Sequence, residues 1–396
     1  MGNTTTLILG GGFGGVAAAQ TLRSLLPNDH KIILIDKSPH FLVGATKTWV
    51  MLGTKNADDI MIERQKILPR DVDFIEAEIQ KINTKSKEVE TSRGKLSGDY
   101  MIVALGADLD MGAIPGLDRA AYSFYTVGDA MELKDRLEEF RAGELVFLIP
   151  QIPFKCPPAP YEAALMLDDH FRRMNIRDQV PISIYTIEPG PMATAGPEMS
   201  SSIRALIEER AIHYHPQKQT KSVDERQKKI IFKDGSEKSY NLLIGIPPHR
   251  VPAPLFEAGL CNESGWIPVD PKTMKVTSGN NTMPVYAVGD NTVVTLPGRY
   301  KPDKPLVLPK AGVFAASQGI VAAKQIAAAI MGKPAADEFD GTGHCYIETG
   351  GGKAIKGEGS FFKMPHPQME RRDPDNEQFR DKIAWIEGWL KGKIMF

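Results

Sequence analysis

Apolar positions along the chain fall into short continuous runs that alternate with longer segments of helical spacing. Residues 5–9 form an apolar run, which a glycine-rich turn joins to a helix-like segment of small residues. A second apolar run, 31–35, ends at Asp36. Continuous apolar runs that alternate with helices are typical of parallel strands buried on both faces. The pattern therefore predicts an α/β fold.

This pattern occurs twice along the chain. A strand-rich meander at 72–98 leads into the apolar run 99–106, and the hairpin signal Asp234-Gly235 precedes the apolar run 239–245. The second copy begins with the apolar run 144–149. We interpret the repeat as an internal duplication that produces two tandem Rossmann-like dinucleotide-binding modules.

The turn after the first run has the spacing Gly10-x-Gly12-x-x-Gly15. Glycines at this spacing allow a sharp turn, a close approach to a pyrophosphate, and tight packing of the helix on the strand. Asp36 follows 26 residues after Gly10, where an acid can bond the hydroxyl pair of a ribose. This context favours dinucleotide binding over a purely structural glycine turn.

The corresponding turn of the second module contains a cysteine among prolines, in the stretch Phe154-Lys-Cys-Pro-Pro-Ala-Pro-Tyr-Glu162. Prolines lack the amide hydrogens that would bind a phosphate, although one proline suits the first turn of a helix. We therefore expect that the second nucleotide site is lost and that the thiol of Cys156 lies in its place.

Composition limits the remaining chemistry. Lys plus Arg (48) balances Asp plus Glu (49), so overall charge gives no sign of a nucleic-acid partner. Three widely spaced cysteines, without a Cys-x-x-Cys or Cys/His cluster, predict no disulfide framework and no metal site. They suit a redox or nucleophilic role. We identify no export signal and no run of about 18 apolar residues that would span a membrane.

Several motifs together resemble a known group. The glycine fingerprint, the 99–106 strand, the element Ala287-Val-Gly-Asp290 and the helix after Lys310 are similar to those of the flavoproteins with two dinucleotide domains, which bind FAD. The stretch Cys156–Glu162 and the segment His344-Cys345-Tyr346 narrow the resemblance to the sulfide:quinone oxidoreductases and the flavoprotein subunit of flavocytochrome c sulfide dehydrogenase.

The resemblance implies a division of the chain and a set of FAD-binding residues. It implies the first part of an FAD module at 1–110, a second module with a degenerate NAD site at 111–245, a return to the FAD module at 246–331, and a region at 332–396 that carries a redox cysteine and an amphipathic helix. The implied FAD-binding residues are Gly10, Gly12, Phe13, Gly14, Gly15, Asp36, Lys37, Gly106, Gly289, Asp290, Lys310 and Gly312.

The resemblance also implies the catalytic groups, which are a redox pair of Cys156 and Cys345 with Glu162 as acid or base. The alternatives are two buried free thiols and a carboxylate that stabilises a helix N-terminus. Lys310 is expected to stabilise the reduced flavin or to be a surface cation. Cys261 is expected to be structural, and His213 and His215 to be ordinary strand residues.

Two segments differ from those relatives. The flavocytochrome subunit usually ties its flavin to a cysteine after the ribose-binding acid, but residues 41–50 contain none, so FAD should be held without a covalent bond. Many quinone-linked enzymes carry a third cysteine before the 144–149 strand, and residues 122–129 contain none. No Cys-x-x-Cys-His haem motif is present, so any cytochrome would be a separate subunit.

The C-terminal segment 379–396 has an apolar stripe at helical spacing, together with two tryptophans and four basic residues. An interfacial membrane helix and a helix packed on the core or on a second subunit explain this pattern equally well. In the quinone-linked family such an element contacts the membrane where quinone enters, and Phe361 and Phe362 would line that entry.

The function implied is that of a peripheral-membrane or cytoplasmic FAD enzyme that oxidises sulfide to polysulfide or sulfur and reduces quinone. Alternatives are a flavocytochrome-like subunit that donates to a cytochrome, a type II NADH:quinone oxidoreductase, and a flavin-binding redox sensor without turnover. The oligomeric state is left open, a homo-oligomer included.

The first prediction concerns the flavin linkage. Because residues 41–50 offer no cysteine, we expect acid precipitation of the purified protein to release yellow flavin into the supernatant. Absorbance spectra of supernatant and pellet measure this directly. Flavin that stays in the washed pellet would contradict the prediction.

Overall fold

The computed structural model describes residues 3–279 and 284–395. Its first sheet has the strand order β20-β9-β1-β2-β5, and every neighbouring pair is parallel. The strands are β1 Thr5–Leu9, β2 Lys31–Asp36, β5 Asp73–Glu76, β9 Tyr100–Val103 and β20 Val285–Ala287. The apolar runs are therefore strands of one α/β sheet, as expected.

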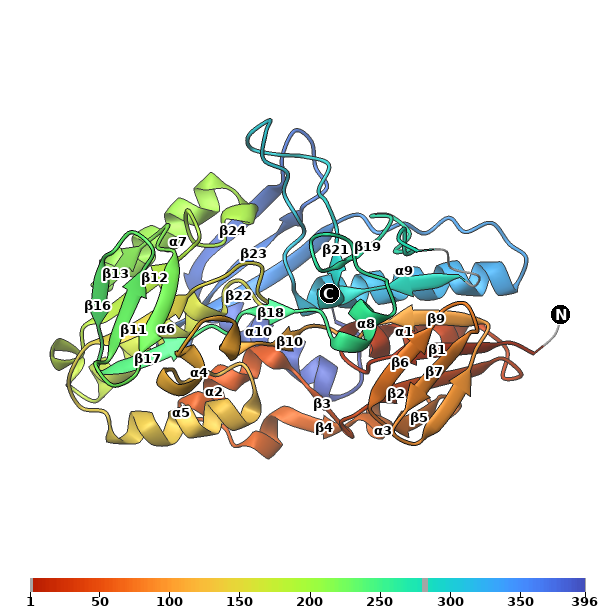
Figure 1. Ribbon diagram of the computed structural model, residues 1–396, viewed down its shortest axis with the longest axis horizontal. Helices are drawn as coiled ribbons and strands as arrows, with labels where there is room; N and C mark the ends of the chain where they lie inside the picture. Colours follow the sequence, from red (N-terminus) through yellow and green to blue (C-terminus); the bar gives the residue numbers. More distant parts are fainter. Residues whose placement is uncertain (1–2, 280–283, 396) are drawn as a thin grey trace.

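Two helices pack against each other on this sheet, α1 (Phe13–Leu25) and α9 (Gly312–Ile330) (Figure 1). Their contact is close because small residues lie in it; a Cβ at Gly319 would come within 2.2 Å of the carbonyl oxygen of Gly14. By length and composition α9 could cross a membrane, so the expectation that no such segment exists is wrong. Because 72% of its apolar window is buried in the protein, α9 is a core helix here.

The second sheet repeats the plan of the first, with the strand order β13-β12-β11-β17 and parallel neighbours. It consists of β11 Leu145–Ile149, β12 Ile182–Thr186, β13 Ile212–His215 and β17 Leu242–Gly245. His213 and His215 are residues of strand β13, as predicted. The helices beside this sheet are α6 Ala159–Arg173 and α7 Pro197–Glu209.

An antiparallel meander precedes the returning strand in each half. In the first half it is β6 Ile79–Asn83, β7 Glu88–Thr91 and β8 Gly94–Ser97, before β9. In the second half it is β14 Thr220–Asp224, β15 Lys229–Phe232 and β16 Glu237–Ser239, before β17. The two modules therefore share one order of elements, which is the pattern that the apolar runs predicted.

The C-terminal region forms a third sheet with a helix. Strands β22 Thr342–Gly350, β23 Lys353–Ser360 and β24 Gln368–Asp375 are antiparallel, and α10 Asn376–Leu390 follows them. Strand β22 contacts α6 of the second module and α9 of the first, so this region joins the two modules. Figure 1 shows it between them.

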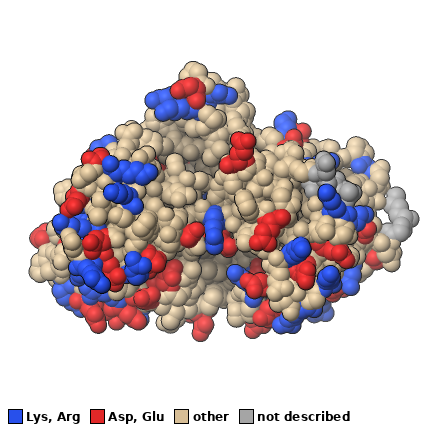
Figure 2. Space-filling model, in the orientation of Figure 1, with Lys and Arg blue, Asp and Glu red and all other residues tan. Residues whose placement is uncertain are grey.

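Shorter elements complete the fold. The remaining helices are α2 Lys47–Met51, α3 Arg64–Ile67, α4 Leu117–Ala120, α5 Val127–Glu139 and α8 Ala253–Glu257. The remaining strands are β3 His40–Leu42, β4 Met61–Glu63, β10 Asp108–Leu109, β18 His249–Arg250, β19 Ile267–Pro268 and β21 Thr292–Val293. On the face shown in Figure 2, acidic and basic side chains are interspersed.

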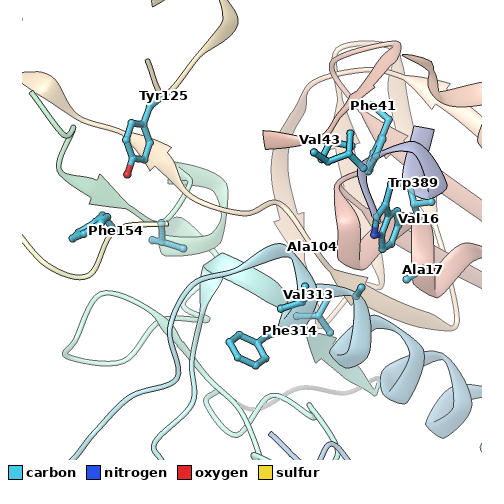
Figure 3. Close-up of a cluster of buried hydrophobic side chains, with 14 of the residues drawn as sticks. Val16, Ala17, Phe41, Val43, Ala104, Tyr125, Phe154, Val313, Phe314 and Trp389 are labelled. Atoms are coloured by element: carbon cyan, nitrogen blue, oxygen red, sulfur yellow. The ribbon is translucent and has the colours of Figure 1, made fainter. Parts of the chain in front are cut away.

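The apolar side of α10 packs on the first module. Trp389 is 1% exposed, and its ring lies 4.8 Å from that of Phe13 and 5.8 Å from that of Phe41. Figure 3 shows Trp389 beside Phe41 and Val16. Trp385 is also buried and stacks on Phe13. Of the two interpretations of the tail, core packing describes this helix, because both tryptophans are buried inside the protein.

A second prediction follows from this packing. Trp389→Ala should lower the free energy of unfolding by about 3–5 kcal/mol, because it removes a fully buried aromatic side chain and leaves a cavity. Chemical denaturation followed by circular dichroism measures the change. Phe256→Ala is the matched control, since Phe256 is 65% exposed and its loss should change little. Equal effects of the two substitutions would contradict the assignment of α10 to the core.

Candidate active site

A cavity of about 340 Å³ lies where the two modules and the C-terminal region meet. It is lined by residues from the turn before α1, from α2, from the turn before α6, from the start of α9 and from β22. Many residues that the sequence singled out line it, namely Gly12, Phe13, Gly14, Gly106, Gly289, Asp290, Lys310, Gly312, Cys156, Glu162 and Cys345. Gly12 and Trp385, which are 373 positions apart in sequence, therefore line one chamber.

The glycine turn at the start of α1 is shaped to receive a phosphate. Gly10 has a φ of +103°, and a Cβ there would lie 2.3 Å from the carbonyl oxygen of Ala104. Gly12 caps α1 without a side-chain hydrogen bond, and a Cβ there would meet nothing within 4 Å. Open space in front of an uncapped helix N-terminus is what a pyrophosphate requires.

The acid at the end of β2 lies next to this turn. Asp36 accepts a hydrogen bond from the amide of Gly11 at 2.6 Å and pairs with the buried guanidinium of Arg64 at 3.5 Å. Lys37 is exposed. The Arg64 side chain also donates to the carbonyl oxygen of Gly11 at 2.9 Å, so both charged groups help to hold the turn in place.

The far side of the cavity presents a buried acid. The Oδ1 atom of Asp290 is buried and has no hydrogen-bond partner in the described part of the chain, and burial raises the pKa of this carboxyl. An unpartnered buried oxygen beside an open, glycine-lined cavity fits the hydroxyl groups of a flavin side chain. The residues present therefore fit FAD.

Lys310 is bound by the protein rather than extended into the cavity. Its Nζ atom donates to the carbonyl oxygens of Asp290 at 2.7 Å and Thr292 at 3.0 Å, and lies 3.4 Å from the centre of the Trp266 ring. Burial lowers its pKa to about 8. Its expected effect on the reduced flavin stays a prediction.

Cys156 has a conformation that is uncommon for a residue with a side chain. Its φ is +57°, and its amide donates to the carbonyl oxygen of Lys310 at 2.8 Å. Such left-handed geometry in a non-glycine residue costs about 1–3 kcal/mol and tends to occur at functional sites. Burial raises the pKa of the thiol to about 11; Glu162 raises it further, while Lys382 and Lys47 lower it.

Cys345 lies on β22 and lines the same cavity as a second free thiol. Burial raises its pKa to about 12, and the charges of Cys156 and Glu162 add to this effect. Cys261, in contrast, follows α8 and packs half-buried against the core, outside this cavity. The structure therefore brings two of the three cysteines to one chamber.

Glu162, in the first turn of α6, belongs to a buried ion network. The Nζ atom of Lys382 lies 3.0 Å from its Oε2 atom and 2.7 Å from the Oε1 atom of Glu348. The amide of Glu348 donates to Glu162 at 2.9 Å, and the indole of Trp49 donates to Glu348 at 2.7 Å. Thr48 completes the contacts of Glu162 at 3.4 Å. We call Glu162, Glu348 and Lys382 the buried triad.

Within the buried triad, attraction between opposite charges opposes the effect of desolvation on the pKa values. Burial raises the pKa of Glu162, and Lys382 opposes this effect. For Lys382, burial favours the neutral form, but the two carboxylates outweigh it and the pKa is raised. The sequence analysis missed Lys382 and Glu348. A signal was present, because Lys382 lies three residues from both Phe379 and Trp385, on the apolar side of its helix.

The expected loss of the second nucleotide site stays a prediction, and two features of the second module bear on it. Its strand-to-helix turn carries the prolines around Cys156, as the sequence shows. Glu188, just beyond β12, is buried and accepts hydrogen bonds from the hydroxyls of Tyr161 and Thr186. Burial raises its pKa to about 7. Glu188 is buried whereas Asp36 is only partly buried, so the Glu188 carboxylate is less open to a ribose than that of Asp36.

A second, largely apolar cavity of about 390 Å³ adjoins the cysteines. Cys345, Pro157 and Pro158 line it on one side, and its other walls include Met192 and Phe361. It shares Met199, His344 and Met369 with an open cleft of about 1020 Å³. The cavity that Cys345 lines therefore adjoins the open cleft.

Comparisons with known proteins agree with this geometry. Residues 4–147 match the family described as pyridine nucleotide-disulphide oxidoreductase, and residues 130–247 match the central domain of the flavocytochrome c sulfide dehydrogenase flavoprotein chain. The sulfide-quinone reductase of Aquifex aeolicus is 27% identical over 340 residues, covering 83% of this chain and 77% of the relative. The mitochondrial sulfide:quinone oxidoreductase of Mus musculus is 24% identical over 373 residues, covering 91% and 78%.

The chain is therefore similar, over most of its length, to the sulfide:quinone oxidoreductases, and in its central part to the flavoprotein chain of flavocytochrome c sulfide dehydrogenase. The solved sulfide:quinone oxidoreductase of Aquifex aeolicus has the same fold, with a TM-score of 0.87 at 24% identity over 99% of this chain and 92% of that chain. The expected fold class and the assignment as an oxidoreductase enzyme are confirmed.

Type II NADH:quinone oxidoreductases match less of the chain. The enzyme of Staphylococcus aureus (strain COL) is 30% identical over 135 residues, which are 34% of this chain and 34% of that protein.

A third prediction concerns the buried triad. Lys382→Met should lower the free energy of unfolding by about 3–5 kcal/mol, because it leaves two buried carboxylates without their cation. Lys391→Met on the same helix is the control, since the ion pair of Lys391 with Glu387 is exposed and should matter little.

The deficit of Lys382→Met should also depend on pH. Without the lysine, the pKa of Glu162 should rise further above its ordinary 4.5. A carboxyl group whose pKa is raised in the folded state lowers the stability of the fold where it is ionised, so this cost increases with pH and disappears at acidic pH. Unfolding measured over a pH series should show the deficit shrinking toward acidic pH. A deficit that is constant across the series would contradict the arrangement of charges.

Proposed function

We propose that this oxidoreductase oxidises sulfide to polysulfide or sulfur, holds FAD without a covalent bond, and delivers the electrons to a quinone. The observation that supports this most is the meeting of Cys156, Cys345 and Glu162 in the cavity whose glycine turn and Asp290 fit FAD. Relatives whose names pair sulfide with quinone cover most of the chain.

The two cysteines are proposed to act as a disulfide. A hydrosulfide ion attacks one cysteine sulfur, so that a new S–S bond forms and a persulfide results, while the bond between the cysteines breaks and the other sulfur leaves as a thiolate. The persulfide and the released thiolate would then re-form the disulfide, with the outer sulfur of the persulfide leaving as zero-valent sulfur or joining a sulfur chain. FAD bound in the cavity would accept the two electrons of this oxidation and pass them on singly or in pairs.

Glu162 is proposed to handle the proton of this exchange. Its carboxylate faces the cavity from the first turn of α6, and its pKa is raised, so it can accept a proton more readily than an exposed glutamate. Lys382 and the amide of Glu348 hold it in position. The thiols alone would ionise little at neutral pH, because burial raises the pKa of both.

The apolar cavity beside Cys345 suits a poorly hydrated sulfur chain that grows on a cysteine. Because quinones dissolve in membranes, the enzyme would work at a membrane surface. Phe361 lines this cavity and packs on Phe314. This packing is enough to explain why Phe361 is buried, without a role at a quinone entry.

A flavocytochrome-like subunit is the second candidate. The match of residues 130–247 to the flavocytochrome flavoprotein family and the absence of a cysteine in 122–129 favour it. Steady-state turnover with a soluble quinone analogue, compared with turnover with cytochrome c, separates the two acceptors. Rapid flavin reduction by NADH would instead favour a type II NADH:quinone oxidoreductase, and failure of both sulfide and NADH would favour a redox sensor.

A fourth prediction tests the cysteine pair. Cys156→Ser and Cys345→Ser should each bind FAD normally and yet be reduced by sulfide far more slowly, and the double variant should lose little more, because two groups that act as one unit are not additive. Stopped-flow flavin absorbance and melting temperature are measured on the same proteins. Cys261→Ser, outside the cavity, should behave like the parent. Normal reduction of Cys156→Ser would refute the proposed sulfide oxidation.

A further inference from the structure

Lys47, which no sequence motif singled out, lies in the cavity with Cys156. It is the first residue of α2, and its ammonium donates to the backbone carbonyl of Tyr125 and lies 5.6 Å from the centre of the Tyr125 ring. Neither Lys47 nor Lys155 has a carboxylate oxygen within 4 Å among the described residues. Two lysines without an acidic partner thus face one chamber.

Tyr125 connects Lys47 to the backbone that carries the cysteine. Its carbonyl binds the Lys47 ammonium, and its hydroxyl donates to the carbonyl oxygen of Lys155 at 3.1 Å. Lys155 immediately precedes Cys156. Tyr125 is itself buried, and the ring of His249 packs against it at 5.4 Å. In the segment 122–129, which has no cysteine, a tyrosine therefore holds both the lysine and the cysteine turn.

The Lys47 charge is coupled to the Cys156 sulfur. Burial lowers the pKa of Lys47 to about 7, and the charge of Lys155 adds to this, whereas Cys156, Asp129 and Asp290 raise it. A thiolate at Cys156 would therefore strengthen the hold of Lys47 on its proton. No lysine is among the groups that shift Cys345, which only burial, Cys156 and Glu162 affect.

We propose that Lys47, held by Tyr125, is a positioning residue that supplies the positive charge for the Cys156 sulfur as a thiolate. This role of Lys47 deepens the proposed function, and it rests on that function for the step in which hydrosulfide opens the disulfide. When hydrosulfide opens the disulfide, one S–S bond forms and one breaks, and the negative charge of the hydrosulfide passes to the cysteine sulfur that is released. Lys47 and Lys382 face Cys156, so the released charge is favoured there.

Other groups around Cys156 do not supply this charge alone. Glu162 of α6 opposes the thiolate, and Cys345 of β22 carries no positive charge. Lys382 of α10 lowers the pKa of Cys156, but its ammonium is bound by two carboxylates within 3.1 Å. Of the two lysines that lower the pKa of Cys156, Lys47 is the one whose hydrogen-bond acceptor, the carbonyl of Tyr125, is neutral.

The test measures thiol ionisation and needs no sulfide. The reduced holoenzyme is alkylated with iodoacetamide over a pH series without oxygen, and peptide mass spectrometry gives the rate at each cysteine, with Cys345 as internal reference. In Lys47→Met, alkylation of Cys156 at neutral pH should slow roughly tenfold for each unit by which the thiol pKa rises. Lys55→Met, an exposed lysine in the loop after α2, is the control and should match the parent.

Lys47→Arg separates charge from packing. Arginine keeps its charge at all accessible pH values, so Cys156 should react at least as fast as in the parent, including above the pH at which Lys47 loses its proton. If Lys47→Met binds too little flavin to be measured, Lys47→Arg still tests the proposal. A pH profile of Cys156 alkylation that is displaced to higher pH in Lys47→Arg would overturn it. An unchanged Cys156 profile in Lys47→Met would overturn it as well.

The two proposals fail in different ways. If Cys156→Ser is reduced by sulfide normally, sulfide oxidation through the cysteine pair is refuted, whereas the alkylation profile still reports on Lys47. If the alkylation profile moves as expected, flavin reduction by sulfide in Lys47→Met should be slowed as well, and Lys47→Arg should restore it. If flavin reduction is slow in Lys47→Met and Lys47→Arg does not restore it, the cause is packing and not the positive charge of Lys47.

Discussion

The buried triad is the contact on which the site depends most. Lys382 comes from the C-terminal helix, Glu348 from the strand that carries Cys345, and Glu162 from the helix that follows Cys156. Three separate elements therefore meet at one ammonium group. An ion pair in a dry environment is stable only with good geometry and additional hydrogen bonds, and here Trp49, Thr48 and the amide of Glu348 provide them.

Through this arrangement the tail is part of the candidate site. Trp385 and Trp389 pack against Phe13, which lies in the FAD-shaped turn, while Lys382 on the same helix reaches Glu162. Displacing α10 would therefore disturb the flavin side and the cysteine side together. The amphipathic pattern of the tail reflects this double contact, with the lysine placed within the buried face.

In the function proposed above, the second module has lost a nucleotide and gained a reaction. Both halves keep the strand, meander and returning strand, so the second half remains a stable sheet. Its phosphate turn carries prolines and Cys156, and the acid beyond its second strand is bonded to Tyr161. The space that remains is largely apolar and is lined by Cys345, which suits sulfur chemistry better than a charged nucleotide.

The sequence alone determined the elements and the first nucleotide turn, because hydrophobic period and glycine spacing are local properties. Its cysteine motifs also pointed to Cys156 and Cys345, although only the tertiary structure shows that β22 carries Cys345 to the chamber of Cys156. Lys47, Tyr125 and Glu348 could not be found in this way, since their roles depend on contacts between distant segments, whereas Lys382 left a signal as a lysine on the apolar side of its helix. The packing of α10 was likewise undecided, because an amphipathic stripe has the same pattern whether a membrane or a protein core covers it.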